Sequence, residues 1–240
     1  MRVLSMDTSS ELGTAAVVID GIVAASIASR VNSQHGETLL PLLDHLLKLA
    51  HLRIEDIDLL AVGLGPGSFT GVRIGVATAK GLSLARGTKM VGVRTSRVLG
   101  RAASGALRAV VIDAKKDEVF VAVFRAEPSG ALTQILEDVH GAPSEVAMQL
   151  AALSHAEGPI TLLGSALVAH HATFRALLPS AIFLPQAWSA PRGDVLALEA
   201  FEAFEARGAD DPSALVPVYV RGADAKLPGG VTVEPPKAPR

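Results

Sequence analysis

Apolar and polar residues in the first half of the chain follow the pattern of three strands and then of alternating helices and strands. Residues 2–6, 13–19 and 21–27 are strand-like, and Asp20-Gly21 is a type I′ turn signal. A helix over about 36–50, a strand over 59–64, a helix over about 70–86 and a strand over 90–93 are predicted to follow. The predicted order of this half is therefore β-β-β-α-β-α-β.

The second half repeats this order of elements without repeating its residues. Strands are predicted at 109–112, 118–124, 132–136, 160–163 and 182–184, with helices at about 143–153 and 165–177. A last helix over 192–207 and an extended segment over 215–220 follow. A shared order of elements indicates an internal duplication.

These patterns divide the chain into four parts. We expect an N-terminal lobe over 1–105, a C-terminal lobe over 106–190, and a final helix and extended segment over 191–221 that return to the N-terminal lobe. Residues 222–240 contain four prolines and three glycines among few apolar residues. That composition predicts a disordered tail.

The most distinctive stretch is a glycine-rich turn and the helix behind it. Residues 63–67 hold three glycines and a proline, which predicts a tight turn after a buried strand, and Thr70 is predicted to be the N-cap. Gly71, Gly75 and Ala79 then recur every four residues. One side of the helix therefore carries almost no side chain, which lets another backbone approach closely.

Leucines crowd the helix over 36–50 and cover roughly 180° of its circumference, wider than the ~100° stripe of a surface helix. They indicate either deep burial within the chain's own fold or one edge packed on a partner helix. With the glycine-striped helix they would form half of a four-helix interface. The predicted interface residues are Leu39, Leu42, Leu43, Leu46, Leu47, Gly71, Ile74, Gly75, Thr78, Ala79 and Leu82.

Composition narrows the functional classes. The chain of 240 residues is 49% hydrophobic and 19% charged, as expected of a well-buried globular protein. Its net charge of −2 gives no basic footprint of a stand-alone nucleic-acid binder. The absence of cysteine excludes disulfides, thiolate catalysis and zinc–cysteine sites. No apolar run has the length of a signal peptide or membrane span, so we expect a cytoplasmic protein.

Two acidic turns are the candidate sites for ligand binding or catalysis. Asp7, Thr8 and Ser9 follow the first strand, and Asp113 follows the matching strand of the second half. A carboxylate beside hydroxyls at a strand end suits phosphate and magnesium. The same residues also suit a turn in which the side chains bond nearby backbone amides. The glycine turn lacks the features of a Walker loop or a dinucleotide fingerprint, and we interpret it as structural.

Four stretches carry a family resemblance. They are Asp7-Thr-Ser, Gly65-Pro-Gly-Ser-Phe-Thr-Gly-Val-Arg-Ile-Gly75, Asp113-Ala-Lys-Lys-Asp-Glu-Val-Phe120 and Pro217-Val-Tyr-Val-Arg221. Together they resemble the TsaB (YeaZ) family of the actin-like and sugar-kinase-like (ASKHA) superfamily, whose members bind ATP between two lobes. The resemblance implies an α/β fold with two lobes, each a mixed sheet with flanking helices.

The resemblance also implies a function. TsaB proteins are non-catalytic partners of the TsaD-like threonylcarbamoyltransferase, which a TsaE-like ATPase joins, in threonylcarbamoyladenosine synthesis on tRNA. We expect no catalytic residue, tRNA contact mainly through the complex, and a homodimer through the same helices when the chain is alone. No cofactor is expected, with binding of ATP or ADP and magnesium at the acidic turns left open.

A metal site is not expected. In TsaD-like enzymes two histidines four residues apart follow a Gly-Val pair and bind the metal. Here Gly92-Val93 leads to Thr95 and Leu99, neither of which replaces an imidazole ligand.

Two rival functions remain. The first is an ATP-dependent phosphotransferase or hydrolase that uses Asp7 and Asp113 in the cleft between the lobes. The second is direct tRNA binding through the arginines at positions 94, 97, 101 and 108, for which a solvated surface is the alternative. The sequence assigns no role to Trp188 or Tyr219.

Overall fold

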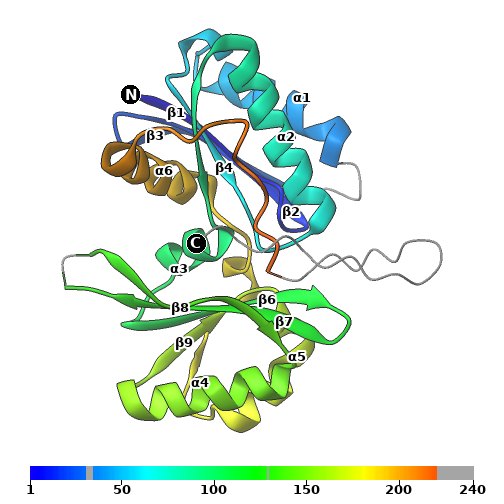
Figure 1. The fold of residues 1–240 in the computed structure, drawn as a ribbon, viewed down its shortest axis with the longest axis vertical. Coiled ribbons are helices and arrows are strands. Elements are labelled where there is room, and N and C mark those ends of the chain that lie inside the picture. Colours follow the sequence, from blue (N-terminus) through cyan, green and yellow to red (C-terminus); the bar gives the residue numbers. More distant parts are fainter. Residues whose placement is uncertain (31–34, 129, 221–240) are drawn as a thin grey trace.

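Two five-stranded mixed sheets, one from each half of the chain, lie one above the other in the computed structural model, which describes residues 1–30, 35–128 and 130–220 (Figure 1). The strand order is β3-β2-β1-β4-β5 in the upper sheet and β8-β7-β6-β9-β10 in the lower sheet. In each sheet the first three strands form an antiparallel meander and the last two run parallel to the first. The predicted two-lobed actin-like fold is therefore confirmed.

The upper lobe consists of β1 (Arg2–Asp7), β2 (Leu12–Ile19), β3 (Ile22–Arg30), α1 (His35–Leu49), the 3-10 helix η1 (Ile54–Asp56), β4 (Leu59–Gly63), α2 (Phe69–Arg86) and β5 (Lys89–Val93). After α3 (Thr95–Ala102), the lower lobe consists of β6 (Leu107–Lys115), β7 (Glu118–Ala126), β8 (Leu132–Gly141), α4 (Pro143–Glu157), β9 (Ile160–Leu163), α5 (Ala166–Leu177) and β10 (Ile182–Phe183). The 3-10 helix η2 (Gln186–Trp188) and α6 (Gly193–Arg207) complete the elements.

The upper sheet is covered on both faces. Helices α1 and α2 pack on one face through a shared apolar cluster, and α6 packs on the other (Figure 1). The β2–β3 hairpin turns at Asp20 (φ 49°) and Gly21 (φ 81°), as the type I′ signal predicts. No helix within the described residues is long and apolar enough to span a bilayer.

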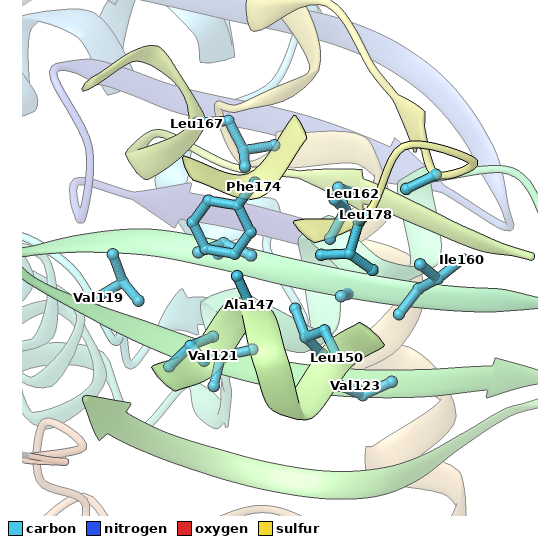
Figure 2. Packing of buried hydrophobic residues seen from close by; sticks show 14 of the residues in the cluster. Val119, Val121, Val123, Ala147, Leu150, Ile160, Leu162, Leu167, Phe174 and Leu178 are labelled. Atoms are coloured by element: carbon cyan, nitrogen blue, oxygen red, sulfur yellow. The ribbon is translucent and has the colours of Figure 1, made fainter. Parts of the chain in front are cut away.

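The lower sheet is covered in the same way. Figure 2 shows Phe174 of α5 and Leu150 of α4 packed on the valines of β7, with Ile160 and Leu162 of β9 beside them. Helix α3 covers the opposite face, where Leu99 packs near Phe124. Strand β8 extends to Gly141, five residues beyond the predicted end at Leu136.

Helix α3 was not predicted, and it joins the two lobes. Its Val98 belongs to an apolar cluster of the upper lobe, whereas the next residue, Leu99, belongs to a cluster of the lower lobe. The segment is eight residues long, which is too short for a helical period to stand out. Its formation depends on apolar surface offered from both sides.

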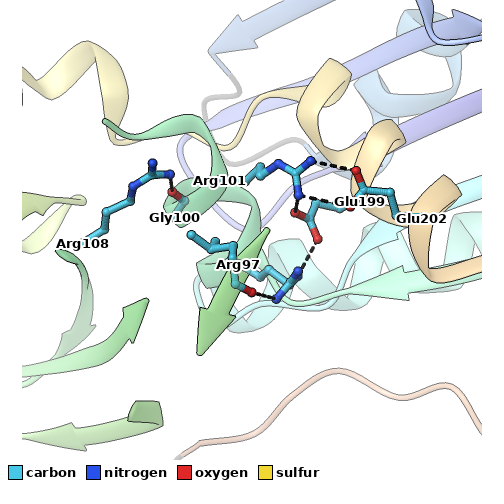
Figure 3. Close-up of polar contacts among 7 residues, drawn as sticks. Arg97, Gly100, Arg101, Arg108, Glu199 and Glu202 are labelled. Atoms are coloured by element: carbon cyan, nitrogen blue, oxygen red, sulfur yellow. Dashed lines mark hydrogen bonds and ion pairs between the residues drawn. The ribbon is translucent and has the colours of Figure 1, made fainter. Parts of the chain in front are cut away.

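A charged network fastens this connection (Figure 3). Glu199 of α6, 4% exposed, accepts hydrogen bonds from Nε of Arg97 at 2.5 Å and Nη1 of Arg101 at 3.1 Å. Arg101 also pairs with Glu202, and Arg97 donates to the carbonyl of Leu132 at the start of β8. The network therefore links α3, α6 and the lower sheet.

The segment after α6, orange in Figure 1, passes beside α2 across the upper lobe. The amide of Asp210 donates to the carbonyl of Met90, its Oδ2 accepts from the amide of Gly92, and the amide of Val218 donates to the carbonyl of Leu64. These bonds hold the segment against β5 and the end of β4. The predicted tail at 222–240 lies outside the described residues.

Candidate functional site

Asp7, at the end of β1, has no solvent-exposed surface. Its Oδ1 accepts from the amide of Ser9 at 2.7 Å, and its Oδ2 accepts from Oγ1 of Thr95 at 2.7 Å. Burial raises the pKa of Asp7 above its ordinary value, although hydrogen bonds from Ser9 and Thr95 oppose the rise. Both carboxylate oxygens therefore accept hydrogen bonds from within the protein, and one of the donors is Thr95 of α3.

The glycine-rich turn closes over this carboxylate. A Cβ on Gly63 would lie 1.9 Å from Oδ2 of Asp7, and a Cβ on Gly75 would lie 2.6 Å from Oγ1 of Thr8. Thr8 donates through that hydroxyl to the carbonyl of Gly71, and the amide of Ser68 donates to the carbonyl of Ser9. The turn and the Asp7–Ser9 segment therefore fit together as one packed unit.

The helix begins earlier than predicted. Its N-cap is Ser68, whose hydroxyl accepts from the amide of Gly71, so Thr70 lies inside the first turn. The prediction of Thr70 as the cap is wrong because Ser68 stands three residues before the amide that needs an acceptor.

Asp113 lies within β6, which continues to Lys115 beyond the predicted end at Ile112, and its side chain is in a different environment from that of Asp7. Its side chain is 35% exposed, and its carboxylate accepts from the amide and the ammonium group of Lys115. Burial alone would raise its pKa, but the hydrogen bonds and charge of Lys115 outweigh burial, so the pKa lies below its ordinary value. The amide of Asp113 donates to Oγ of Ser165.

Most of the predicted interface residues lie inside the chain's own core. Those that are buried are Leu39, Leu43, Leu46, Leu47, Gly71, Gly75 and Ala79; those that are partly exposed are Leu42, Ile74, Thr78 and Leu82. The stripe Gly71–Gly75–Ala79 faces β1 and β4, because Thr8 and Val62 pack against Gly75. The prediction that this stripe faces a partner is therefore wrong.

The outward face of α2 carries a different set of small residues. Ala77, Gly81 and Ala85 are exposed and again recur every four residues. They lie two positions after Gly75 and Ala79, about 200° around the helix, and Leu84 among them is 76% exposed. On α1, Leu40 and Leu49 are 55% and 52% exposed. The second stripe is visible in the sequence, but nothing in the sequence tells the inner stripe from the outer one.

The four arginines of the rival tRNA site are engaged within the protein. Arg94 pairs with Asp138, and Arg97 and Arg101 pair with Glu199. Arg108 donates to the carbonyls of Gly100 and Gly105 at the end of α3, the former contact drawn in Figure 3. Each of the four guanidinium groups is therefore bonded to an acceptor of the protein itself, although Arg94, Arg97 and Arg101 keep about a third of their side-chain surface exposed.

Comparisons with known proteins place the chain in a family. The profile of the family described as "TsaD: tRNA N6-adenosine threonylcarbamoyltransferase" matches residues 21–189. The chain is 37% identical over 134 residues to the "tRNA threonylcarbamoyladenosine biosynthesis protein TsaB" of Escherichia coli, covering 54% of this chain and 58% of that protein. It therefore spans little more than half the length of that relative.

Two further matches extend over nearly the whole chain. The TsaB protein of Bacillus subtilis is 28% identical over 94% of this chain and 96% of its own length. A solved structure, "YeaZ from Pseudomonas aeruginosa", superposes with a TM-score of 0.77 at 25% identity, covering 91% of this chain and 99% of that one. The chain belongs to the TsaB (YeaZ) family.

Thr95 and Leu99, which the resemblance aligns with metal-binding positions, both have structural contacts. Thr95 is 2% exposed; its Oγ1 donates to Asp7 and accepts from the amide of Gly65 at 3.1 Å. Leu99, one turn later on α3, is 1% exposed and packs in the lower lobe. No group of three or more His, Cys, Asp or Glu side chains suited to a metal ion occurs among the described residues.

Two of the TsaB landmark stretches meet in space. Nε of Arg73 donates to Oη of Tyr219 at 2.9 Å, and the guanidinium carbon lies 3.5 Å from the ring centroid of Phe69. The rings of Phe69 and Tyr219 are 5.8 Å apart, and both residues are about half exposed. Arg73 and Tyr219 are 146 positions apart in the sequence, so only the fold shows that they form one cluster with Phe69.

Proposed function

We propose that this chain is the accessory subunit of a TsaD-type threonylcarbamoyltransferase in the formation of threonylcarbamoyladenosine on tRNA. Its family membership and the names of its relatives support this pathway. In the proposed role it contributes a docking surface and no catalytic residue. A TsaE-type ATPase joins the complex, and tRNA is contacted mainly by the complex.

The observation that supports the proposal best is which residues occupy α3 and what they contact. Thr95 and Leu99 stand where the resemblance to TsaD-like enzymes puts two metal-binding histidines. Thr95 is hydrogen-bonded to Asp7 of the upper lobe, and Leu99 packs in an apolar cluster of the lower lobe. A hydroxyl bonded to a buried carboxylate and a leucine in an apolar cluster can neither bind a metal ion nor activate a water molecule. The chain keeps the scaffold of its catalytic relatives without these groups.

The outward faces of α1 and α2 are the proposed docking surface. Leu40, Leu49 and Leu84 are each more than half exposed on the same side of the upper sheet, and the small residues of α2 let a partner helix approach closely. In the absence of the partner, a second copy covers the same surface. The proposed surface also includes the partly exposed residues of the same two helices, Leu42, Ile74, Thr78 and Leu82.

Reconstitution tests the proposal. The TsaD-type enzyme of the same genome should form threonylcarbamoyladenosine on tRNA with this chain present and much less without it. Leu84→Asp should weaken binding to the enzyme by about tenfold or more, because it places a charge in an apolar contact. Val168→Asp is the matched control, since Val168 is 60% exposed on α5 of the other lobe.

The result that would overturn the proposal is modification at the same rate without the chain. The rival phosphotransferase or hydrolase predicts turnover of magnesium-ATP by the chain alone, lost in Asp7→Asn. The geometry disfavours that rival, because both oxygens of Asp7 are bonded within the protein and away from solvent.

A further inference from the structure

The charges on α2 are all of one sign. Over residues 69–86 the helix carries Arg73, Lys80 and Arg86 and not one acidic residue. Arg86 pairs with Glu55 at 2.9 Å. The pKa of Asp211 is lowered by hydrogen bonds from Ser213 and, to a smaller extent, by the charge of Lys80. No carboxylate of the described residues pairs with Arg73, which is instead stacked on an aromatic ring.

Arg73 is nevertheless held in place. Its guanidinium lies over Phe69, its Nε donates to Tyr219, and the Tyr219 ring centroid lies 5.6 Å from the guanidinium carbon. Within the described part of the chain, its two terminal nitrogens have no hydrogen-bond partner. A stacked guanidinium loses little freedom on binding, and its planar fork matches a carboxylate.

The segment after α6 sets this arrangement. Tyr219 follows Val218, whose amide is bonded to the carbonyl of Leu64 beside the glycine-rich turn. The tyrosine therefore reaches Arg73 from a fixed backbone position. Phe69 and Tyr219 expose about half of their surface around the cation. Arginine and tyrosine with apolar surroundings are the residues that dominate binding energy at protein interfaces.

Resting on the proposed function, we propose that Arg73 is the cationic anchor of the docking surface and that it receives a carboxylate side chain of the transferase subunit. The same feature disfavours a second copy as the preferred occupant of α2. In a symmetric contact of α2 with α2, two acid-free helices with unneutralised arginines would face each other. On α1, the carboxylate of Asp44 is already paired with Lys48 at 2.6 Å.

Binding of the full-length chain to the transferase subunit, measured by titration at low and moderate salt, tests the anchor. Arg73→Glu should weaken binding by about thirty-fold or more, Arg73→Lys by about five-fold, and Tyr219→Phe by about three-fold. Arg175→Glu is the matched control: Arg175 also lies over an aromatic ring, that of Phe183 at 4.2 Å, but in the lower lobe. It should change affinity by less than about two-fold.

Two further readouts separate the possible occupants. Self-association of Arg73→Glu, followed by sedimentation, should be unchanged or tighter, because the reversed charge lowers the net positive charge of each of the two α2 helices that would face each other. A scan of Asp and Glu to Arg on the transferase should find a position that restores binding of Arg73→Glu. Thermal melting checks that each variant is folded.

The outcomes against the anchor are distinct from those against the function. If Arg73→Glu binds the transferase like the unchanged chain while Leu84→Asp does not, the anchor is wrong and the docking surface stands. If neither variant affects binding, the docking surface on α1 and α2 is wrong as well, whereas the proposed function itself fails only if tRNA is modified at the same rate without the chain. If Arg73→Glu loses tRNA binding by the isolated chain but keeps the transferase, the anchor takes phosphate and the proposal is overturned. Equal loss of self-association and transferase binding also overturns it.

Discussion

The two lobes share one strand order, yet the corresponding aspartates, Asp7 and Asp113, lie in opposite environments. Asp7 ends β1 and Asp113 lies two residues before the end of β6, the first strand of the lower meander, but Asp7 is fully buried and Asp113 keeps a 35% exposed side chain. The pKa of Asp7 is raised by burial. Burial also acts to raise the pKa of Asp113, but the hydrogen bonds and charge of Lys115 outweigh burial and lower this pKa below its ordinary value. The difference arises from the loop after the fourth strand of each lobe.

In the upper lobe Gly63 at the end of β4 lies directly against Asp7, Gly75 on α2 lies against Thr8, and Gly67 of the loop lies against Ser9. In the lower lobe the loop contains Gly164 and Ser165; the hydroxyl of Ser165 accepts from the amide of Asp113 and leaves the carboxylate at the surface. A duplicated topology therefore fixes where an acidic turn lies, while a few loop residues decide whether it holds the fold together or meets solvent.

The largest effect is expected at the inner stripe of α2. Gly75→Leu should lower the free energy of unfolding by about 3 kcal/mol, because its side chain would collide with Thr8 in a packed core. Gly81→Ala on the outer face should instead raise it by roughly 0.5–1 kcal/mol, since a Cβ there meets open space. Urea titration of both variants checks the contrast. Equal and small effects would mean that the turn and α2 are not the tight unit described.

The second-largest effect on stability is expected at the connection between the lobes. Glu199→Gln removes the charge that lies between Arg97 and Arg101, and we expect a loss of about 2 kcal/mol. Glu202→Gln is the control, because Glu202 also pairs with Arg101 but is 52% exposed, and solvent screening should keep its effect below about 0.5 kcal/mol. Thermal unfolding of the two variants measures the difference, and a Glu202 effect as large as that of Glu199 would contradict it.

The smallest and most specific effect concerns pH. The raised pKa of Asp7 means that its contribution to stability falls as pH rises from the ordinary value through the folded-state pKa. The lowered pKa of Asp113 means that its contribution is present above the ordinary value and is lost as pH falls through the folded-state pKa. Stability relative to Asp7→Asn and relative to Asp113→Asn should therefore change in opposite directions between about pH 3 and pH 7. Parallel urea titrations that show the same direction for both would refute the assignment.

Apolar periodicity and turn residues were sufficient to predict the two meanders, the helices that follow them and the duplicated order. The motifs were sufficient to identify the family. These features are local, because each is encoded by neighbours along the chain and by the period of a strand or a helix.

Three things were decided by the tertiary structure alone. The side of α2 that faces the core depends on Thr8 and Val62, which no helical wheel contains. Helix α3 forms because two lobes offer it apolar surface and Glu199 binds its arginines. The cluster of Phe69, Arg73 and Tyr219 exists because a distant segment returns to the upper lobe. Each depends on contacts between residues far apart in sequence, which local propensity does not encode.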